Sequence, residues 1–189
     1  MAWVNTSPLV KTYSLEEFWS LPDPADRSKL ELIAGVLYMT PPPEYTHDYV
    51  LRRLNRLLAR HLDKTGDTGS LYIPRAAIWT GPSTCLEPDL FYVSAELEAK
   101  QDPRHRGSAD LVIEVVSPAS AMYDRNTKAD TYFALGVREL WLVDEIGATV
   151  EVRVRTSQQP VVKTFSGDDH VTSTVLHELN LPVRQIFND

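Results

Sequence analysis

The segment from Asp110 to Pro118, with the sequence DLVIEVVSP, is the strongest constraint on the fold of this chain. Its nearly unbroken run of apolar, mostly β-branched residues predicts a strand that is covered on both faces, deep within a sheet. Glu114 lies at the centre of this run. An ionised carboxylate in such a place is costly unless a cation, a metal ion or several hydrogen-bond donors meet it. The strand is therefore a candidate functional site, and the alternative is a structural ion pair of Glu114 with Lys128 or an arginine.

The composition is that of a globular protein, and 189 residues suffice for one domain with a substantial core. The single cysteine, Cys85, excludes an internal disulfide and a cysteine zinc cage, and it is typical of a reducing cytosol. No secretory pattern is visible in Met1–Ser7, and no apolar run approaches the roughly 20 residues of a membrane span. We therefore expect a cytoplasmic protein with no membrane partner. The net charge of −7 argues against a general nucleic-acid coat protein, but not against a local basic patch.

Two features predict an N-terminal part of the domain, residues 14–40. The capping box Ser14–Glu17 predicts a short helix over residues 15–20. Two short apolar runs, 29–33 and 36–40, predict a β-hairpin. Glu31 lies within the first run, where it either faces water on an alternating strand or serves the site as a ligand or water-orienting group.

A central part, residues 45–144, begins with a long helix. Val50 and a series of leucines recur every three or four residues between 46 and 65, and Gly66 and Gly69 then end the pattern. A second row on this helix is basic and is typical of a solvated face, with contacts to DNA phosphates as the alternative. Its members are Arg52, Arg56 and Arg60, joined by Arg53 and Lys64.

The remaining pattern alternates between strands and helices. We expect strands at 70–73, 76–80, 90–93 and 138–144, a loop with one helical turn at 95–106, and a helix at 121–135. A C-terminal part, residues 148–187, contains predicted strands at 149–155, 161–165 and 171–175, and a tail whose apolar residues can dock on the body. No glycine-rich loop joins a strand to a helix, which excludes a doubly wound nucleotide-binding fold.

Asp89 is the second acid of interest, because it opens the strand at 90–93. If that strand neighbours the strand of Glu114, the two carboxyl groups can lie side by side on one face of the sheet. Two carboxylates a few ångströms apart repel each other unless a divalent cation lies between them, and oxygen ligands suit Mg²⁺ or Mn²⁺. By itself, Asp89 is more simply explained as a residue that accepts local backbone N–H bonds. The metal hypothesis requires that both acids share one face and that a phosphate can reach them.

Lys128 lies on the helix that follows the Glu114 strand. It could orient a water molecule or offset negative charge on a phosphate, or it could form an exposed helix salt bridge with Asp124, four residues earlier. His47 is better explained as a residue of a helix N-terminus than as a catalytic base, and Tyr132 as a packing residue. No Ser–His–Asp set and no histidine- or cysteine-rich metal cluster is visible.

As an ordered set, these residues resemble the Uma-two family of restriction-endonuclease-like nucleases, in the PD-(D/E)XK phosphodiesterase superfamily. The resemblance runs from about Leu15 to Phe187. Its motifs are Pro88-Asp89, Glu114 within Val-Ile-Glu-Val-Val-Ser-Pro, Asp124, Lys128, Tyr132, Gly136-Val137 and Glu139–Asp144, together with Glu31 and His47.

The resemblance implies an α/β (α+β) fold, with residues 1–189 as a single domain in which helices flank a mixed central β-sheet. It implies an endonuclease that cleaves DNA with Mg²⁺ (or Mn²⁺), with Asp89 and Glu114 as metal ligands. Lys128 would lie near the attacking water, and Glu31 would be a further catalytic residue. Because cutting a duplex needs two active sites, a homodimer is one expected assembly.

The chain departs from the family pattern in two places. Val116 stands where the superfamily lysine would fall, so Lys128 would have to act from the helix. Ala34 and Val36 stand where the family usually has an acidic pair near the hairpin turn. The first departure favours an alternative function, a non-catalytic nucleic-acid- or protein-binding domain that keeps the nuclease fold. A second alternative is a structural or assembly role in which the acids form core ion pairs.

Overall fold

The computed structural model describes residues 10–26, 28–102, 104–117 and 121–188, and every structural statement below concerns these residues. Two expectations from the sequence fall outside them: the end of the Glu114 strand at Pro118, and the lack of a secretory pattern in Met1–Ser7. In the described part of the chain, no helix is long and apolar enough to cross a membrane.

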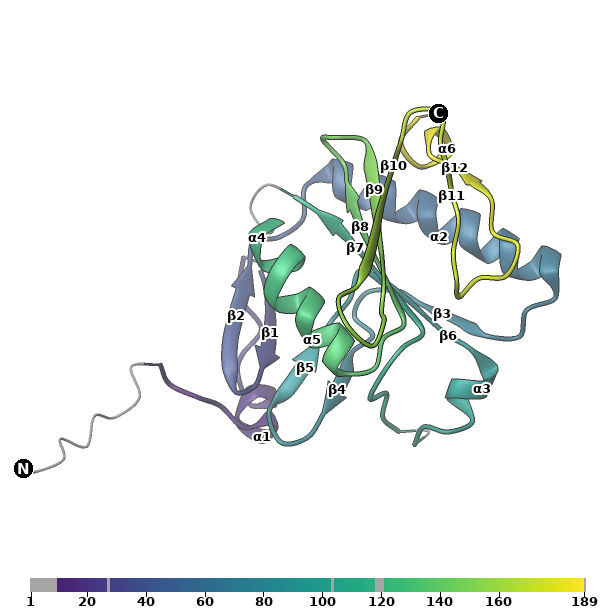
Figure 1. Ribbon diagram of the computed structural model, residues 1–189. Coiled ribbons are helices and arrows are strands. Elements are labelled where there is room, and N and C mark those ends of the chain that lie inside the picture. Colours follow the sequence, from purple (N-terminus) through teal and green to yellow (C-terminus); the bar gives the residue numbers. More distant parts are fainter. Residues whose placement is uncertain (1–9, 27, 103, 118–120, 189) are drawn as a thin grey trace, which may run out of the picture.

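A six-stranded sheet with the strand order β10-β9-β8-β7-β6-β3 forms the centre of the protein (Figure 1). β7 and β8 pair in parallel and the other neighbours are antiparallel, so the sheet is mixed, as predicted. Its strands are β3 (Ser70–Tyr72), β6 (Leu90–Val93), β7 (Leu111–Val116), β8 (Glu139–Asp144), β9 (Thr149–Val154) and β10 (Val161–Ser166). Every residue of β7 is buried, which confirms the prediction of a strand covered on both faces.

Helix α2 (Tyr45–Thr65) covers one face of this sheet (Figure 1). The residues at three- and four-residue spacing form its buried side, and they pack against the strands and the C-terminal segment. Gly66 ends the helix in the left-handed conformation, with a φ of 67°. Gly69 does not help to end the helix as predicted. It lies against the ring of Tyr92, and a Cβ at this position would overlap the Tyr92 hydroxyl.

The basic row of α2 differs from the prediction at one residue. Arg52, Arg56 and Arg60 are exposed, as expected for a solvated face. Arg53 is only 7% exposed, and its guanidinium lies 4.7 Å from the centre of the Tyr49 ring. Arg53 lies three residues after Val50 and four residues before Leu57, so its side chain lies beside the buried stripe.

The opposite face of the sheet is covered by an irregular helical segment and by a second sheet. The helix predicted for residues 121–135 is confirmed as a continuous helical segment, but its middle is a π-helical turn: α4 (Ala121–Tyr123), η1 (Asp124–Lys128) and α5 (Ala129–Ala134). Such π-turns often occur at functional sites. Asp124 and Lys128 are both buried, so their salt bridge is not the exposed one considered from the sequence.

The second sheet has the order β2-β1-β5-β4 and carries the predicted hairpin. Its strands are β1 (Lys29–Ile33), β2 (Val36–Thr40), β4 (Ile78–Thr80) and β5 (Thr84–Leu86). Ala34 and Gly35 form the turn with φ values of 48° and 82°, the positive values that a two-residue hairpin turn needs. The short strand β5 was not predicted. The capping box of Ser14 and Glu17 is present at helix α1 (Leu15–Trp19), as expected.

The C-terminal segment packs on the α2 side of the large sheet. The strand predicted at 171–175 is wrong beyond Val171, because β11 (His170–Val171) pairs only with β12 (Leu181–Pro182). The hydroxyl of Ser173 accepts N–H bonds from Val175 and Leu176, which removes the donors that a ladder would use. The chain ends in α6 (Arg184–Phe187), and the expected helical turn after β6 is α3 (Ala95–Glu98). Ile186 is fully buried, which confirms that the tail docks on the body.

Cys85 on β5 lies in a small core cluster with Leu15 and Leu32, and it is 3% exposed. Burial, with the negative charges of Glu87 and Glu31, raises the pKa of its thiol to about 12. Because the thiolate is the reactive form, we expect almost no reaction of the folded protein with Ellman's reagent at pH 8, and full reaction after unfolding in guanidinium. A native protein that reacts as fast as free cysteine would contradict this packing.

Candidate active site

The register of β6 and β7 brings the two predicted metal ligands together. Leu90 pairs with Ile113 in this antiparallel ladder, so Asp89, just before β6, lies opposite Glu114. The backbone N–H of Val115 donates a 2.9 Å hydrogen bond to Asp89 Oδ2. Residues directly opposite each other in such a ladder share a face of the sheet. Asp89 and Glu114 are thus neighbours at the end of this ladder, and Glu114 faces the side of the sheet covered by α5.

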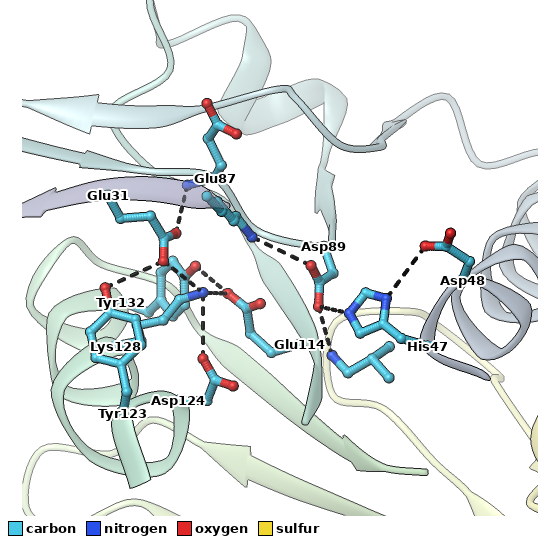
Figure 2. A network of polar contacts seen from close by, with 12 residues as sticks. Glu31, His47, Asp48, Glu87, Asp89, Glu114, Tyr123, Asp124, Lys128 and Tyr132 are labelled. Atoms are coloured by element: carbon cyan, nitrogen blue, oxygen red, sulfur yellow. Dashed lines mark hydrogen bonds and ion pairs between the residues drawn. The ribbon is translucent and has the colours of Figure 1, made fainter. Parts of the chain in front are cut away.

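Glu114 is held by two donors from the helical segment (Figure 2). Its Oε1 accepts from Lys128 Nζ at 2.7 Å and from the hydroxyl of Tyr132 at 2.5 Å. Burial raises the pKa of the Glu114 carboxyl to about 8, even though the charge of Lys128 acts in the opposite direction. Tyr132 is therefore not only a packing residue, because its hydroxyl positions the central acid.

Lys128 lies at the centre of a buried group of acids (Figure 2). Besides Glu114, its Nζ contacts Glu31 Oε2 at 3.3 Å and Asp124 Oδ1 at 3.6 Å, and its side chain is 2% exposed. Burial by itself would lower the pKa of the ammonium, but the negative charges of Glu114 and Glu31 outweigh burial and raise it well above its usual value. The lysine is therefore a permanent cation that three carboxyl groups share.

Glu31 belongs to this group and does not face water. Glu31 is 1% exposed, so the alternative that it faces water on an alternating strand is wrong. Its Oε1 accepts a 2.9 Å bond from the N–H of Glu87, and its Oε2 accepts a 3.3 Å bond from the hydroxyl of Tyr123. The small sheet thus contributes an acid from β1 to the site that β7 and the helical segment form.

Asp89 is surrounded by donors on its other side (Figure 2). Its Oδ2 is 3.0 Å from His47 Nε2, in the first turn of α2, and its Oδ1 is 3.4 Å from Lys29 Nζ, at the start of β1. Burial would raise the pKa of Asp89, but Lys29 and His47 outweigh burial and lower it, so the group is a carboxylate. Although burial acts against protonation of the imidazole, the bond to Asp89 raises the pKa of His47. His47 is thus both a helix N-terminal residue and part of this group.

The side chains of the site differ in their exposure to solvent. The side chains of Glu31, Glu114 and Lys128 are 1–2% exposed, which closes them off from solvent in this arrangement. The Asp89 side chain is 11% exposed, that of His47 12%, and that of Lys29 25%. Among the described residues of the site, those on the side of Asp89, His47 and Lys29 are the most exposed, so this is the side from which we expect a phosphate to approach.

The donor set can be compared with what a metal ion needs. Among the residues that the structure describes, no three histidine, cysteine, aspartate or glutamate side chains lie close enough to enclose a metal ion. This excludes the closed cage of a structural zinc site within that part of the chain. Two carboxylates on adjacent strands, one of them ionised and facing the accessible side, fit Mg²⁺, which binds through one or two carboxylates and keeps several waters.

A mixed sheet with opposed acids on two neighbouring strands, and a lysine from the following helix, defines the class of restriction-endonuclease-like proteins. The chain belongs to the Uma2 family, whose description is "Putative restriction endonuclease" and whose family model matches residues 15–184. This membership supports a nuclease-like function.

The fold is also that of a solved protein. A crystal structure of "a putative nuclease belonging to DUF820" from Anabaena variabilis ATCC 29413 superposes with a TM-score of 0.73 at 20% sequence identity. The match covers 93% of this chain and 97% of that chain. It confirms the predicted fold class of a mixed sheet flanked by helices. No protein of curated function matches this chain.

Lys29 and Tyr123 are the site residues that sequence reasoning missed. For Lys29 a signal was present, because residues two apart on a strand point to the same face and Lys29 is two residues from Glu31. For Tyr123 there was none, since the π-turn that separates it from Lys128 leaves no mark on the apolar pattern.

Proposed function

We propose that this protein is a Mg²⁺-dependent endonuclease that hydrolyses phosphodiester bonds of DNA, with Asp89 and Glu114 as the metal ligands. The observation that carries the proposal is the position of Asp89, just before β6, beside Glu114 on β7, with the ammonium of Lys128 in contact with the carboxyl of Glu114. Membership in a family described as "Putative restriction endonuclease" supports the choice of substrate.

Each residue of the site has a role in this proposal. The divalent cation, when bound, lowers the pKa of a water molecule and offsets the charge of the scissile phosphate. Asp89 is kept ionised and fixed in place by His47 and by the N–H of Val115. Tyr132 and Lys128 hold the carboxyl of Glu114, so that little reorganisation is needed when substrate arrives.

Lys128 takes the place of the superfamily lysine in this proposal. Val116 is 2% exposed within the apolar core, whereas the Nζ of Lys128 reaches Glu114 from the helical segment. Its charge can offset the negative charge that develops on a phosphate bound near Glu114. Glu31, which contacts the same ammonium, acts as an acid that helps to orient this group. A homodimer, which would supply two active sites for the two strands of a duplex, stays a prediction.

One observation favours the alternative of a non-catalytic binding domain. Glu31, Glu114 and Lys128 form an ion network that is almost closed to solvent, as in a structural core. A protein of this kind would bind nucleic acid or a partner protein on the same fold, and it would neither bind a divalent cation through Asp89 nor cut DNA.

Calorimetric titration with Mn²⁺ distinguishes the two functions. We expect one binding event in the native protein and its loss in Asp89→Asn, which keeps the shape of the side chain but removes its charge. The same preparations should nick supercoiled plasmid in Mg²⁺ and not in EDTA. Asp63→Asn, at an exposed acid near the end of α2, is the matched control and should bind Mn²⁺ as the native protein does. Binding that survives Asp89→Asn would place the metal elsewhere and remove the proposed site.

A further inference from the structure

Two lysines serve the site, and they differ in how firmly they are held. Lys128 is 2% exposed and contacts three carboxyl groups, so it cannot leave without opening the core. The Lys29 side chain is 25% exposed, and among the described residues its one ion pair is with Asp89. Its Nζ–Oδ1 distance of 3.4 Å exceeds the 2.7–2.9 Å that is usual for a charged N–H···O⁻ bond. Lys29 is therefore the displaceable cation of the pair.

The two oxygens of Asp89 also differ. Oδ2 accepts hydrogen bonds from two donors held in place by the fold, the backbone N–H of Val115 and the imidazole of His47 at the start of α2. Oδ1 contacts only Lys29 among the hydrogen bonds and ion pairs that the described residues show. A ligand for a divalent cation needs a lone pair that faces the accessible side, and Oδ1 is the oxygen that can supply it once Lys29 moves.

We propose that Lys29 is a tethered counterion that neutralises the metal-binding oxygen of Asp89, and that a divalent cation must displace it in order to bind. The inference rests on the proposed function and adds a residue to it. Lys29 lies at the start of β1, on the accessible side of the site, so its ammonium can swing toward solvent, or toward a phosphate, without disturbing the sheet. The affinity for the metal is then set by competition with the chain's own cation.

Competition has a measurable consequence for affinity. Because displacement of Lys29 opposes binding, Lys29→Met should bind Mn²⁺ about tenfold more tightly than the native protein in calorimetry. Lys29→Arg keeps the charge and should stay near the native affinity. Lys100→Met is the matched control, since Lys100 also pairs with a carboxylate, that of Glu96, but on α3 and its following turn, outside the site. It should leave the affinity unchanged.

Displacement also has a chemical signature that does not depend on catalysis. The native protein is acetylated with an N-hydroxysuccinimide ester at pH 8, in EDTA and in saturating Mg²⁺, and each lysine is quantified by mass spectrometry. The modification of Lys29 should rise severalfold in Mg²⁺, because its ammonium is released from Asp89. Lys100 should be modified equally in both conditions, and Lys128 should stay protected in both.

The possible results separate this inference from the function on which it rests. Metal binding that requires Asp89, combined with unchanged affinity in Lys29→Met and unchanged acetylation of Lys29, would overturn the inference and leave the metal site standing. A complete lack of Mn²⁺ binding in both the native protein and Lys29→Met would overturn both. Binding that is detectable only in Lys29→Met would support the inference, since the native lysine would then be the obstacle.

Discussion

Lys128→Met is expected to lower the free energy of unfolding by about 3–5 kcal/mol, the usual cost of removing one partner from a buried ion pair. The reason is the number of acids that share this ammonium. Glu31, Glu114 and Asp124 lie within 3.6 Å of Nζ, and none of the four side chains is more than 5% exposed. Methionine fills a similar volume, so the loss is electrostatic and not a cavity. Urea denaturation followed by far-UV circular dichroism, in EDTA, measures it.

Lys100→Met serves as the control for this experiment too, because its ion pair with Glu96 is exposed and should cost less than about 1 kcal/mol. A Lys128→Met protein within 1 kcal/mol of the native stability would show that the buried acids do not need this cation. It would also remove the electrostatic basis for placing Lys128 in the site.

The structure changes what a double replacement can show. If the protein has the structural role considered from the sequence, Glu114 and Lys128 form a buried core ion pair, and replacing both with apolar residues should leave the fold as stable as before or more stable. In the structure, Glu31 and Asp124 would still lose the ammonium that they share. Glu114→Leu with Lys128→Met should therefore remain less stable than the native protein.

Much of the site could be predicted because it depends on local patterns. The apolar run of β7 marked a buried strand, and an acid in its middle had to have a partner. The place of Asp89 near Glu114 could be predicted once β6 and β7 were assumed to be neighbouring strands, because Asp89 immediately precedes β6. The observed register, Leu90 with Ile113, is the one that makes this pairing direct.

The remaining features depend on contacts between distant parts of the chain. The strand pattern places Lys29 on the same face as Glu31, but its contact with Asp89 joins residues 60 positions apart, which no local pattern records. Strand β5 has only three residues, too few for a visible alternation. The π-turn η1 contains both Asp124 and Lys128, whereas the apolar spacing around it predicts an ordinary helix.

Glu114→Gln is expected to reduce Mg²⁺-dependent nicking of plasmid DNA by at least about a hundredfold, since it removes one of the two proposed metal-binding carboxylates. Glutamine keeps the volume of glutamate, and its carbonyl can still accept the hydrogen bond from Tyr132. Lys128 keeps Glu31 and Asp124 as partners. The variant should therefore fold, and its far-UV spectrum and its elution in gel filtration should match those of the native protein.

Asp110→Asn is the matched control for this loss. Asp110 is a buried acid that immediately precedes the same strand, and it accepts a bond from the N–H of Ser94 and pairs with Arg138, far along β7 from the site. Its replacement removes a buried charge near β7 without touching the proposed metal ligands, so nicking per folded molecule should persist. If Glu114→Gln folds and cuts DNA at the native rate, the buried acid of β7 serves only the core, and the family fold in this chain carries some other function.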